Sequence, residues 1–273
     1  MRLFRMLAGL LLAAATAGHA SAEVPRADVR AFMERSGIVA QLAEGAKQIR
    51  EILPQQLEGE SPSDLTKPFT DLVVDAWDDQ KLIAALEVAY SEALTPDDLA
   101  AGLAFLDTSL GRRVVELEVK SGTVEAAKEV QAKEIELVAT LESDPARWAA
   151  VRRIDEALRV TDISATVIMT LVRAGVLAAA GKADPDTIAQ IDEIMEIQRP
   201  QLIELNRRSI LAGFAYTYRA LSLDGLAAYA DVLESKASRT MNGIFFAVID
   251  EYYQAVGEEI GEGMGALFRQ KRS

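Results

Sequence analysis

Residues 93–113 read ALTPDDLAAGLAFLDTSLGRR, and this stretch decides the fold. Thr95 precedes Pro96, and Asp98 follows three residues after the threonine, which is the pattern of a capped helix start. Leucines three and four residues apart come next, as on one face of a helix. Gly111 is suited to the corner before another helix. The stretch therefore predicts a short helix between two longer ones.

Similar signals divide the rest of the chain into helices. Capping residues precede prolines at Ser61-Pro62, Asp144-Pro145 and Asp184-Pro185, and no stretch has a convincing strand alternation. We expect an all-α bundle of about eight helices. Pro68 falls in an early turn of the second, Ser121-Gly122 is a candidate break in the fourth, and Pro200 is expected to kink or end the sixth. The predicted helices span residues 26–56, 64–93, 96–108, 110–142, 145–182, 185–220, 223–235 and 238–268.

A related stretch lies 127 residues further along the chain, at residues 220–239. Both stretches place a Ser/Thr cap and a first-turn aspartate at the start of a short helix that leads into a longer one. Duplication predicts tandem helical repeats at residues 23–142 and 143–273; chance similarity between alanine-rich helices is the alternative. The residues that recur are Ala93, Leu94, Asp97, Leu99, Ala100, Ala101, Leu106 and Arg112, at Ala220, Leu221, Asp224, Leu226, Ala227, Ala228, Leu233 and Arg239.

The first copy is similar to a motif of a known bacterial family. Residues 105–113, Phe-Leu-Asp-Thr-Ser-Leu-Gly-Arg-Arg, resemble the Phe-Tyr-x-Ser/Thr-Pro-x-Gly-x-Lys element of the periplasmic domain of unknown function 2059 family (DUF2059). The resemblance covers residues 90–117, with Ser109 in place of the family's proline. The second copy, residues 233–239, lacks the aromatic residue and the glycine. The resemblance implies an exported, all-helical protein, and it implies no activity.

The residues of this motif predict a structural role. Thr95 and Asp98 are expected to cap the short helix, with Phe105 near its end. Gly111 is expected to adopt a left-handed conformation at the helix corner. Arg112 and its neighbour Arg113 are then placed to bond exposed carbonyls or nearby carboxylates.

The first 22 residues have the pattern of a cleavable signal peptide. Arg2 and Arg5 precede an apolar run from Leu7 to Ala17, and Ala20-Ser21-Ala22 forms the cleavage site. The run is roughly half the ~20 residues that a membrane span needs. We therefore expect a soluble periplasmic protein with no span after cleavage. A lipid anchor is not expected, because the chain has no cysteine.

Composition excludes several kinds of chemistry. The only histidine, His19, lies in the predicted signal peptide. Without cysteine or histidine, the mature chain has no Ser–His–Asp or Cys–His nucleophile, no usual zinc site and no disulfide. Loss of Arg2 and Arg5 shifts the net charge from −13 to −15, which disfavours nucleic acid as a partner. We predict no catalytic residue, no cofactor and no metal ligand.

Two functional readings remain. The first is a non-enzymatic binding or interaction protein whose partner is another envelope protein or an apolar ligand; its oligomeric state stays open. Tyr216, Tyr218, Tyr229 and Tyr252 belong to an aromatic-rich last third of the chain and are candidates for an apolar groove, although ordinary core packing is the plainer explanation.

The alternative is a histidine-free envelope hydrolase that uses paired carboxylates. Candidates are the acidic clusters at residues 78–79, 97–98, 192–196 and 258–259, which an acidic helical protein also produces by composition. Two inward-facing carboxylates in one cleft would favour the enzyme, and a broad apolar groove would favour binding.

Glycines near the end of the chain suggest tight packing. Gly257, Gly261 and Gly265 recur every four residues, so they share one side of a helix. Since glycine costs about 1 kcal/mol per site in a helix interior, close approach of a neighbouring helix is expected. A helix that ends near Val256 and leaves a loose tail is the alternative.

Overall fold

The computed structural model describes residues 23–55, 66–180 and 185–271, and every regular element in these ranges is an α-helix. The all-α prediction is confirmed. The predicted signal peptide, Ser61-Pro62 and Asp184 lie outside the described residues. The helices are α1 (Arg26–Arg35), α2 (Ile38–Glu51), α4 (Thr66–Ala76), α5 (Asp79–Ala93), α6 (Pro96–Leu106), α7 (Ser109–Ser121), α8 (Val124–Glu142), α9 (Pro145–Leu158), α10 (Val160–Ala180), α11 (Pro185–Thr217), α12 (Leu223–Leu233) and α13 (Lys236–Lys271).

The prediction of about eight helices is wrong, because several long helices are divided. Gly37 has a φ of 81° and separates α1 from α2. Asp78 caps α5 and so divides the predicted helix 64–93 into α4 and α5. Thr123 caps α8 after the expected break at Ser121-Gly122. Arg159, with a φ of 50°, separates α9 from α10. Local caps and left-handed residues override a continuous apolar pattern at these points.

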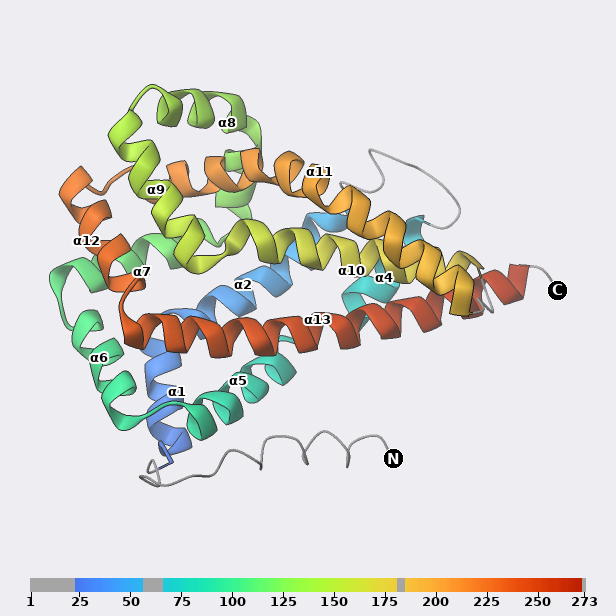
Figure 1. Cartoon of the computed structure of the whole chain (residues 1–273), viewed down its shortest axis with the longest axis horizontal. Coiled ribbons are helices and arrows are strands. Elements are labelled where there is room, and N and C mark those ends of the chain that lie inside the picture. Colours follow the sequence, from blue (N-terminus) through green and yellow to red (C-terminus); the bar gives the residue numbers. More distant parts are fainter. Residues whose placement is uncertain (1–22, 56–65, 181–184, 272–273) are drawn as a thin grey trace.

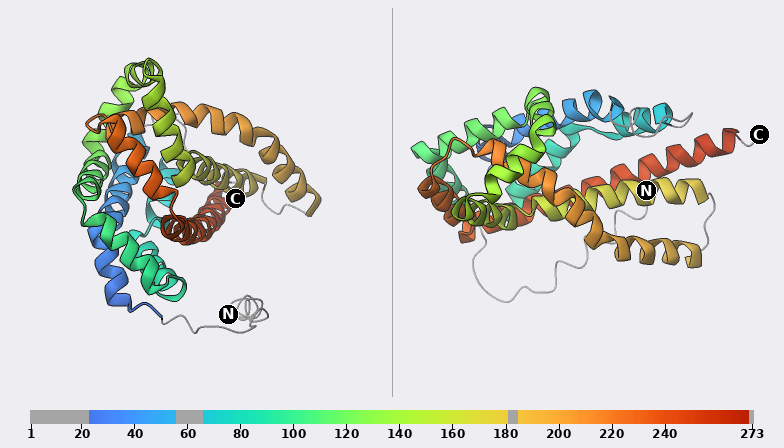
Figure 2. Two further views of the ribbon diagram at one scale, coloured as in Figure 1. Left: turned by 60° about the vertical axis from the view of Figure 1, so that its left-hand side comes forward. Right: turned by 90° about the horizontal axis from the view of Figure 1, so that it is seen from above.

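Pro200 lies inside α11 and does not end it. The helix changes direction along its length (Figure 2), as expected where a proline removes a backbone hydrogen bond. Helix α11 therefore reaches both α8 and α10. None of the described helices is long and apolar enough to span a membrane.

The last helix of each half of the chain packs against the other half. Helix α13 runs the length of the molecule (Figure 1) and packs against α4, α5 and α6 of the first half, as well as α10. In return, α8 of the first half packs mainly against α11 of the second. One apolar core combines buried residues of α1, α5 and α6 with Met241 and Ile249 of α13. A second core combines Val114 and Leu141 with buried residues of α9, α11 and α12.

The two short helices match closely in position and bonding. Helices α6 and α12 each span 11 residues, 127 positions apart, and Thr95 and Ser222 cap them through side-chain oxygens. The next helix start is repeated as well: the Thr108 hydroxyl accepts from Gly111 at 2.9 Å, and the Ser235 hydroxyl accepts from Ser238 at 3.2 Å. The hydroxyl caps therefore persist where the second sequence copy has lost its glycine.

Gly111 does not adopt the predicted left-handed conformation. It lies in the first turn of α7, and Gly37 is the only glycine with a positive φ among the described residues. The glycine is required for a different reason, because a Cβ at this position would lie 2.1 Å from the carbonyl oxygen of Phe105. The glycine at position 111 is therefore explained by the close approach of the end of α6 to the start of α7, and not by a left-handed backbone conformation.

The C-terminal helix is ordered through Lys271, so the loose-tail alternative is wrong. A Cβ at Gly257 would lie 2.5 Å from Thr170 Cγ2 on α10, and one at Gly263 would lie 2.4 Å from Leu72 on α4. Close packing therefore occurs on two sides of α13. It does not extend along the whole predicted row, since a Cβ at Gly265 meets only Arg269 of its own helix.

Candidate functional site

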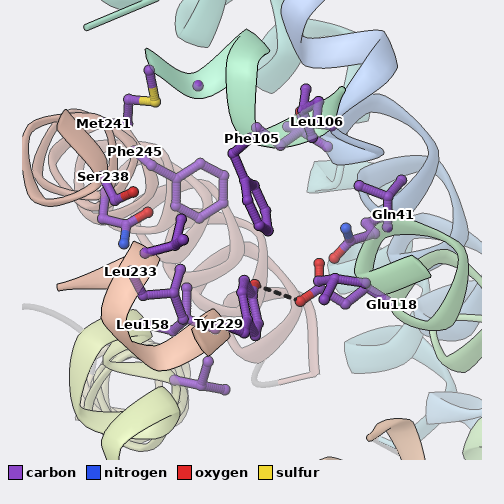
Figure 3. A pocket seen from close by; sticks show the side chains of 18 of the residues that line it. Gln41, Phe105, Leu106, Glu118, Leu158, Tyr229, Leu233, Ser238, Met241 and Phe245 are labelled. Carbon is purple, nitrogen blue, oxygen red and sulfur yellow. Dashed lines mark hydrogen bonds between the residues drawn. The ribbon is translucent and has the colours of Figure 1, made fainter. Parts of the chain in front are cut away.

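A pocket of about 570 Å³ lies where the two halves meet (Figure 3). Its walls come from α2, α6 and α7 of the first half and from α12 and the start of α13 of the second. A volume of this size is typical of small-molecule sites, which are mostly apolar with a few polar groups. The apolar lining includes Phe105, Leu158, Phe214, Leu233, Met241 and Phe245, and the polar lining includes Gln41, Gln48, Glu118, Ser238 and Asn242.

Glu118 is the only carboxylate among the described residues that line the pocket, and no lysine or arginine lines it with them. It projects from α7, and in Figure 3 its carboxylate points toward Tyr229. The Tyr218 hydroxyl donates to Glu118 Oε1 at 2.6 Å, and the Tyr229 hydroxyl donates to the same oxygen at 2.7 Å. One oxygen therefore accepts both phenols.

The other oxygen, Oε2, has no hydrogen-bond donor among the described residues, and the Glu118 side chain is half-buried in the pocket wall. Burial raises the pKa of the Glu118 carboxyl, and the two tyrosine hydrogen bonds act in the opposite direction. Burial also raises the pKa values of Tyr218 and Tyr229, and the adjacent carboxylate adds to this. Both phenols therefore remain neutral donors well above pH 7.

Stacked aromatic rings hold the two phenols in place. Phe105 of α6 stacks on Tyr229 of α12, with ring centroids 5.9 Å apart and planes 9° apart. Phe214 of α11 stacks on Tyr218 in the same way, at 5.9 Å and 14°. The two tyrosine rings then meet edge to face at 5.8 Å. This packing fixes the direction from which Glu118 Oε1 is approached.

The structure brings together two of the four tyrosines predicted to form a groove. Tyr218 and Tyr229 line the pocket. The Tyr216 hydroxyl instead donates to Glu129 on α8 at 2.7 Å. Tyr252 lies against the edge of α5, where its hydroxyl accepts from the Asp78 amide at 2.6 Å. The pocket therefore contains two of the four candidate residues, because Tyr216 on α11 and Tyr252 on α13 face other helix interfaces.

The predicted structural motif partly coincides with the pocket. Thr95 and Asp98 form a complete capping box on α6, as expected. Arg112 donates to the Asp107 carbonyl at 2.5 Å, and Arg113 pairs with Glu116. Phe105, assigned only a structural role from sequence, also lines the pocket.

Three members of the acidic clusters proposed for catalysis have structural partners. Asp78 and Asp98 cap helices. Asp192 pairs with Arg173 at 2.6 Å, which lowers the pKa of that carboxyl. In the part of the chain that the structure describes, no group of three or more acidic, histidine or cysteine residues is placed to hold a metal ion.

Sequence reasoning missed Glu118, the most distinctive side chain of the pocket. A signal was present, because Leu110, Val114 and Glu118 are spaced four apart and share one face of α7. A carboxylate on the buried stripe of an amphipathic helix departs from the usual pattern and marks a site to inspect. Its tyrosine partners lie at least 100 residues away in the sequence, so spacing alone does not reveal them.

Comparison with known proteins gives no further assignment: the chain matches no protein-family model, no curated protein and no solved structure.

Proposed function

We propose that this protein is a non-enzymatic binding protein that takes a small apolar ligand in the pocket between its two halves. The observation that carries the proposal is the apolar, aromatic-lined pocket of about 570 Å³ with a single carboxylate in its wall. Such a wall supplies burial for an apolar ligand and one polar group to orient it. A small ligand is thus preferred to another envelope protein as the partner.

The lone carboxylate argues against the hydrolase. Hydrolysis by carboxylates requires one acid and one base or nucleophile across the reacting bond. Among the described lining residues, Glu118 has no second carboxylate opposite it, and its partners are two phenols that hold their protons. At the pocket that contains Glu118, the observations therefore favour binding over catalysis.

We further propose that the protein acts in the periplasm after export. The support is the basic, apolar and small-residue pattern of residues 1–22, together with the resemblance of residues 90–117 to the DUF2059 family. Membership of that family is likewise a proposal that rests on this motif.

We propose that the chain arose by duplication of residues 23–142 into residues 143–273. The equal lengths of α6 and α12, the repeated caps and the packing of each half's last helix against the other half support this. Two further bonds agree with it: Arg112 and Arg239 each donate to the carbonyl of the acidic residue five positions earlier. In this arrangement, the pocket lies between equivalent short helices.

A binding experiment with a cavity-filling variant tests the proposed function. Gly45 lines the pocket, and a Cβ built on it meets no atom within 4 Å, so Gly45→Leu adds bulk there without a backbone clash. Gly243→Leu is the matched control, because Gly243 also lies in a helix with open space around its Cβ but does not line the pocket. The neutral dye Nile red reports binding by its fluorescence.

We expect the wild-type protein and Gly243→Leu to bind Nile red with similar affinity. Gly45→Leu should weaken binding at least tenfold, because its side chain occupies ligand space. Absence of saturable dye binding, or equal binding by Gly45→Leu and the wild type, would contradict the proposed function.

A further inference from the structure

We propose that the ligand of this pocket is a single-chain amphiphilic amine whose protonated amino group pairs with Glu118. The inference rests on the proposed function and specifies the class of ligand. It is carried by a half-buried carboxylate in the pocket wall, one oxygen of which accepts two hydrogen bonds while the other accepts none from the described residues.

The environment of Glu118 leaves room for a cationic donor. Tyr218 and Tyr229 both donate to Oε1, whereas Oε2 has no donor among the described residues. No described ion pair includes Glu118, and no described lysine or arginine lines the pocket. A carboxylate removed from water without a cation is costly, so a ligand that brings a positive charge gains more here than at an exposed carboxylate.

Charge distinguishes between ligands of similar shape. An ammonium group donates hydrogen bonds to Oε2 and neutralises the carboxylate. An alcohol donates one hydrogen bond without a charge, and a fatty acid anion places a second negative charge beside Glu118. The expected order of affinity is therefore amine, then alcohol, then carboxylate.

The pocket also has two different ends. Figure 3 shows Glu118 and Gln41 at one side and Met241, Phe245 and Leu233 at the other, where Ser238 also lies, so only the Glu118 side carries a charged group. A ligand with one polar head fits this arrangement with its head toward α7 and its chain toward the start of α13. The apolar chain then contributes to affinity through the burial of its methylene groups.

Calorimetric titration of the full chain with octylamine, octan-1-ol and octanoate tests the proposal at pH 7. We expect octylamine to bind at least tenfold more tightly than octan-1-ol, and octanoate to bind most weakly. Glu118→Gln retains an acceptor for the tyrosines and removes the charge, so it should abolish the preference for the amine while octan-1-ol still binds.

Glu129→Gln is the matched control. Glu129 also accepts a tyrosine hydroxyl, from Tyr216 at 2.7 Å, but it pairs with Lys133 and does not line the pocket. This variant should keep the amine preference of the wild type.

Two results would overturn the ligand class. One is equal or weaker binding of octylamine relative to octan-1-ol by the wild type, which needs no variant to fold. The other is an unchanged amine preference in Glu118→Gln. If Nile red still binds in a Gly45-dependent manner, only the ligand class has failed; if the dye does not bind either, the proposed function has failed as well.

Discussion

Phe105 and Tyr229 stack with their ring planes 9° apart, and this contact joins the two halves of the chain. Phe105 lies in the last turn of the short helix α6 and packs against both apolar cores. Tyr229 belongs to α12, and its hydroxyl donates to Glu118. One aromatic pair thus connects the packing of the halves to the polar group of the pocket.

Phe105→Ala should lower the free energy of unfolding by about 2–3 kcal/mol. This is somewhat less than the ~3–5 kcal/mol typical of a fully buried phenylalanine, because Phe105 is half-buried. Phe105→Leu should recover most of the loss and lack only the ring stack, worth about 0.5–1.5 kcal/mol. Urea denaturation followed by circular dichroism measures both; an unchanged midpoint in the alanine variant would show that the stack does not join the cores.

Gly111→Ala should destabilise the protein by roughly 1–3 kcal/mol. The added methyl group would lie 2.1 Å from the Phe105 carbonyl oxygen, so α6 and α7 would have to move apart. Gly243→Ala is the control, since its Cβ meets no atom within 4 Å and should stabilise α13 by up to ~1 kcal/mol. Thermal unfolding of the two variants should shift in opposite directions; a stabilised Gly111→Ala variant would exclude the close approach.

Gly257→Leu should destabilise the protein more than Gly257→Ala. A Cβ at Gly257 would lie 2.5 Å from Thr170 Cγ2. Thr170 has little freedom to move aside, because a β-branched side chain in a helix has few allowed rotamers. We expect the free energy of unfolding to fall by about 1 kcal/mol in Gly257→Ala and by several kcal/mol in Gly257→Leu, as measured by denaturant unfolding. Equal stability of all three proteins would mean that α10 and α13 are not in close contact here.

The stability difference between wild type and Glu118→Gln should depend on pH. Burial raises the pKa of this carboxyl in the folded state, so the folded protein holds the proton more tightly than the unfolded chain does. Between the ordinary glutamate pKa and the raised folded value, wild-type stability therefore falls with increasing pH relative to the variant. Tyr218 and Tyr229, which face the carboxyl, stay protonated in this range because their pKa values are raised above 10.

Urea unfolding of both proteins between pH 4 and pH 8 measures this difference. A wild type that gains stability over the variant as pH rises would show that the tyrosine hydrogen bonds outweigh burial.

The sequence by itself determined the helical class and the capped short helices. Thr95, Pro96 and Asp98 act within one turn, so the start of α6 depends only on local hydrogen bonds and backbone geometry. The same holds for Ser222 at α12. The sequence did not determine where long apolar stretches divide into separate helices. Arg159, for example, separates α9 from α10 through a left-handed backbone conformation that depends on its surroundings.

Only the tertiary structure decided the pocket. Glu118 meets Tyr218 and Tyr229 because α7 packs beside α11 and α12 of the other half of the chain. Tyr216, two residues from Tyr218, faces α8 instead, since the chain turns as α11 ends at Thr217. Spacing along the sequence determines which face of its helix a residue occupies. Long-range packing determines which other helix that face contacts.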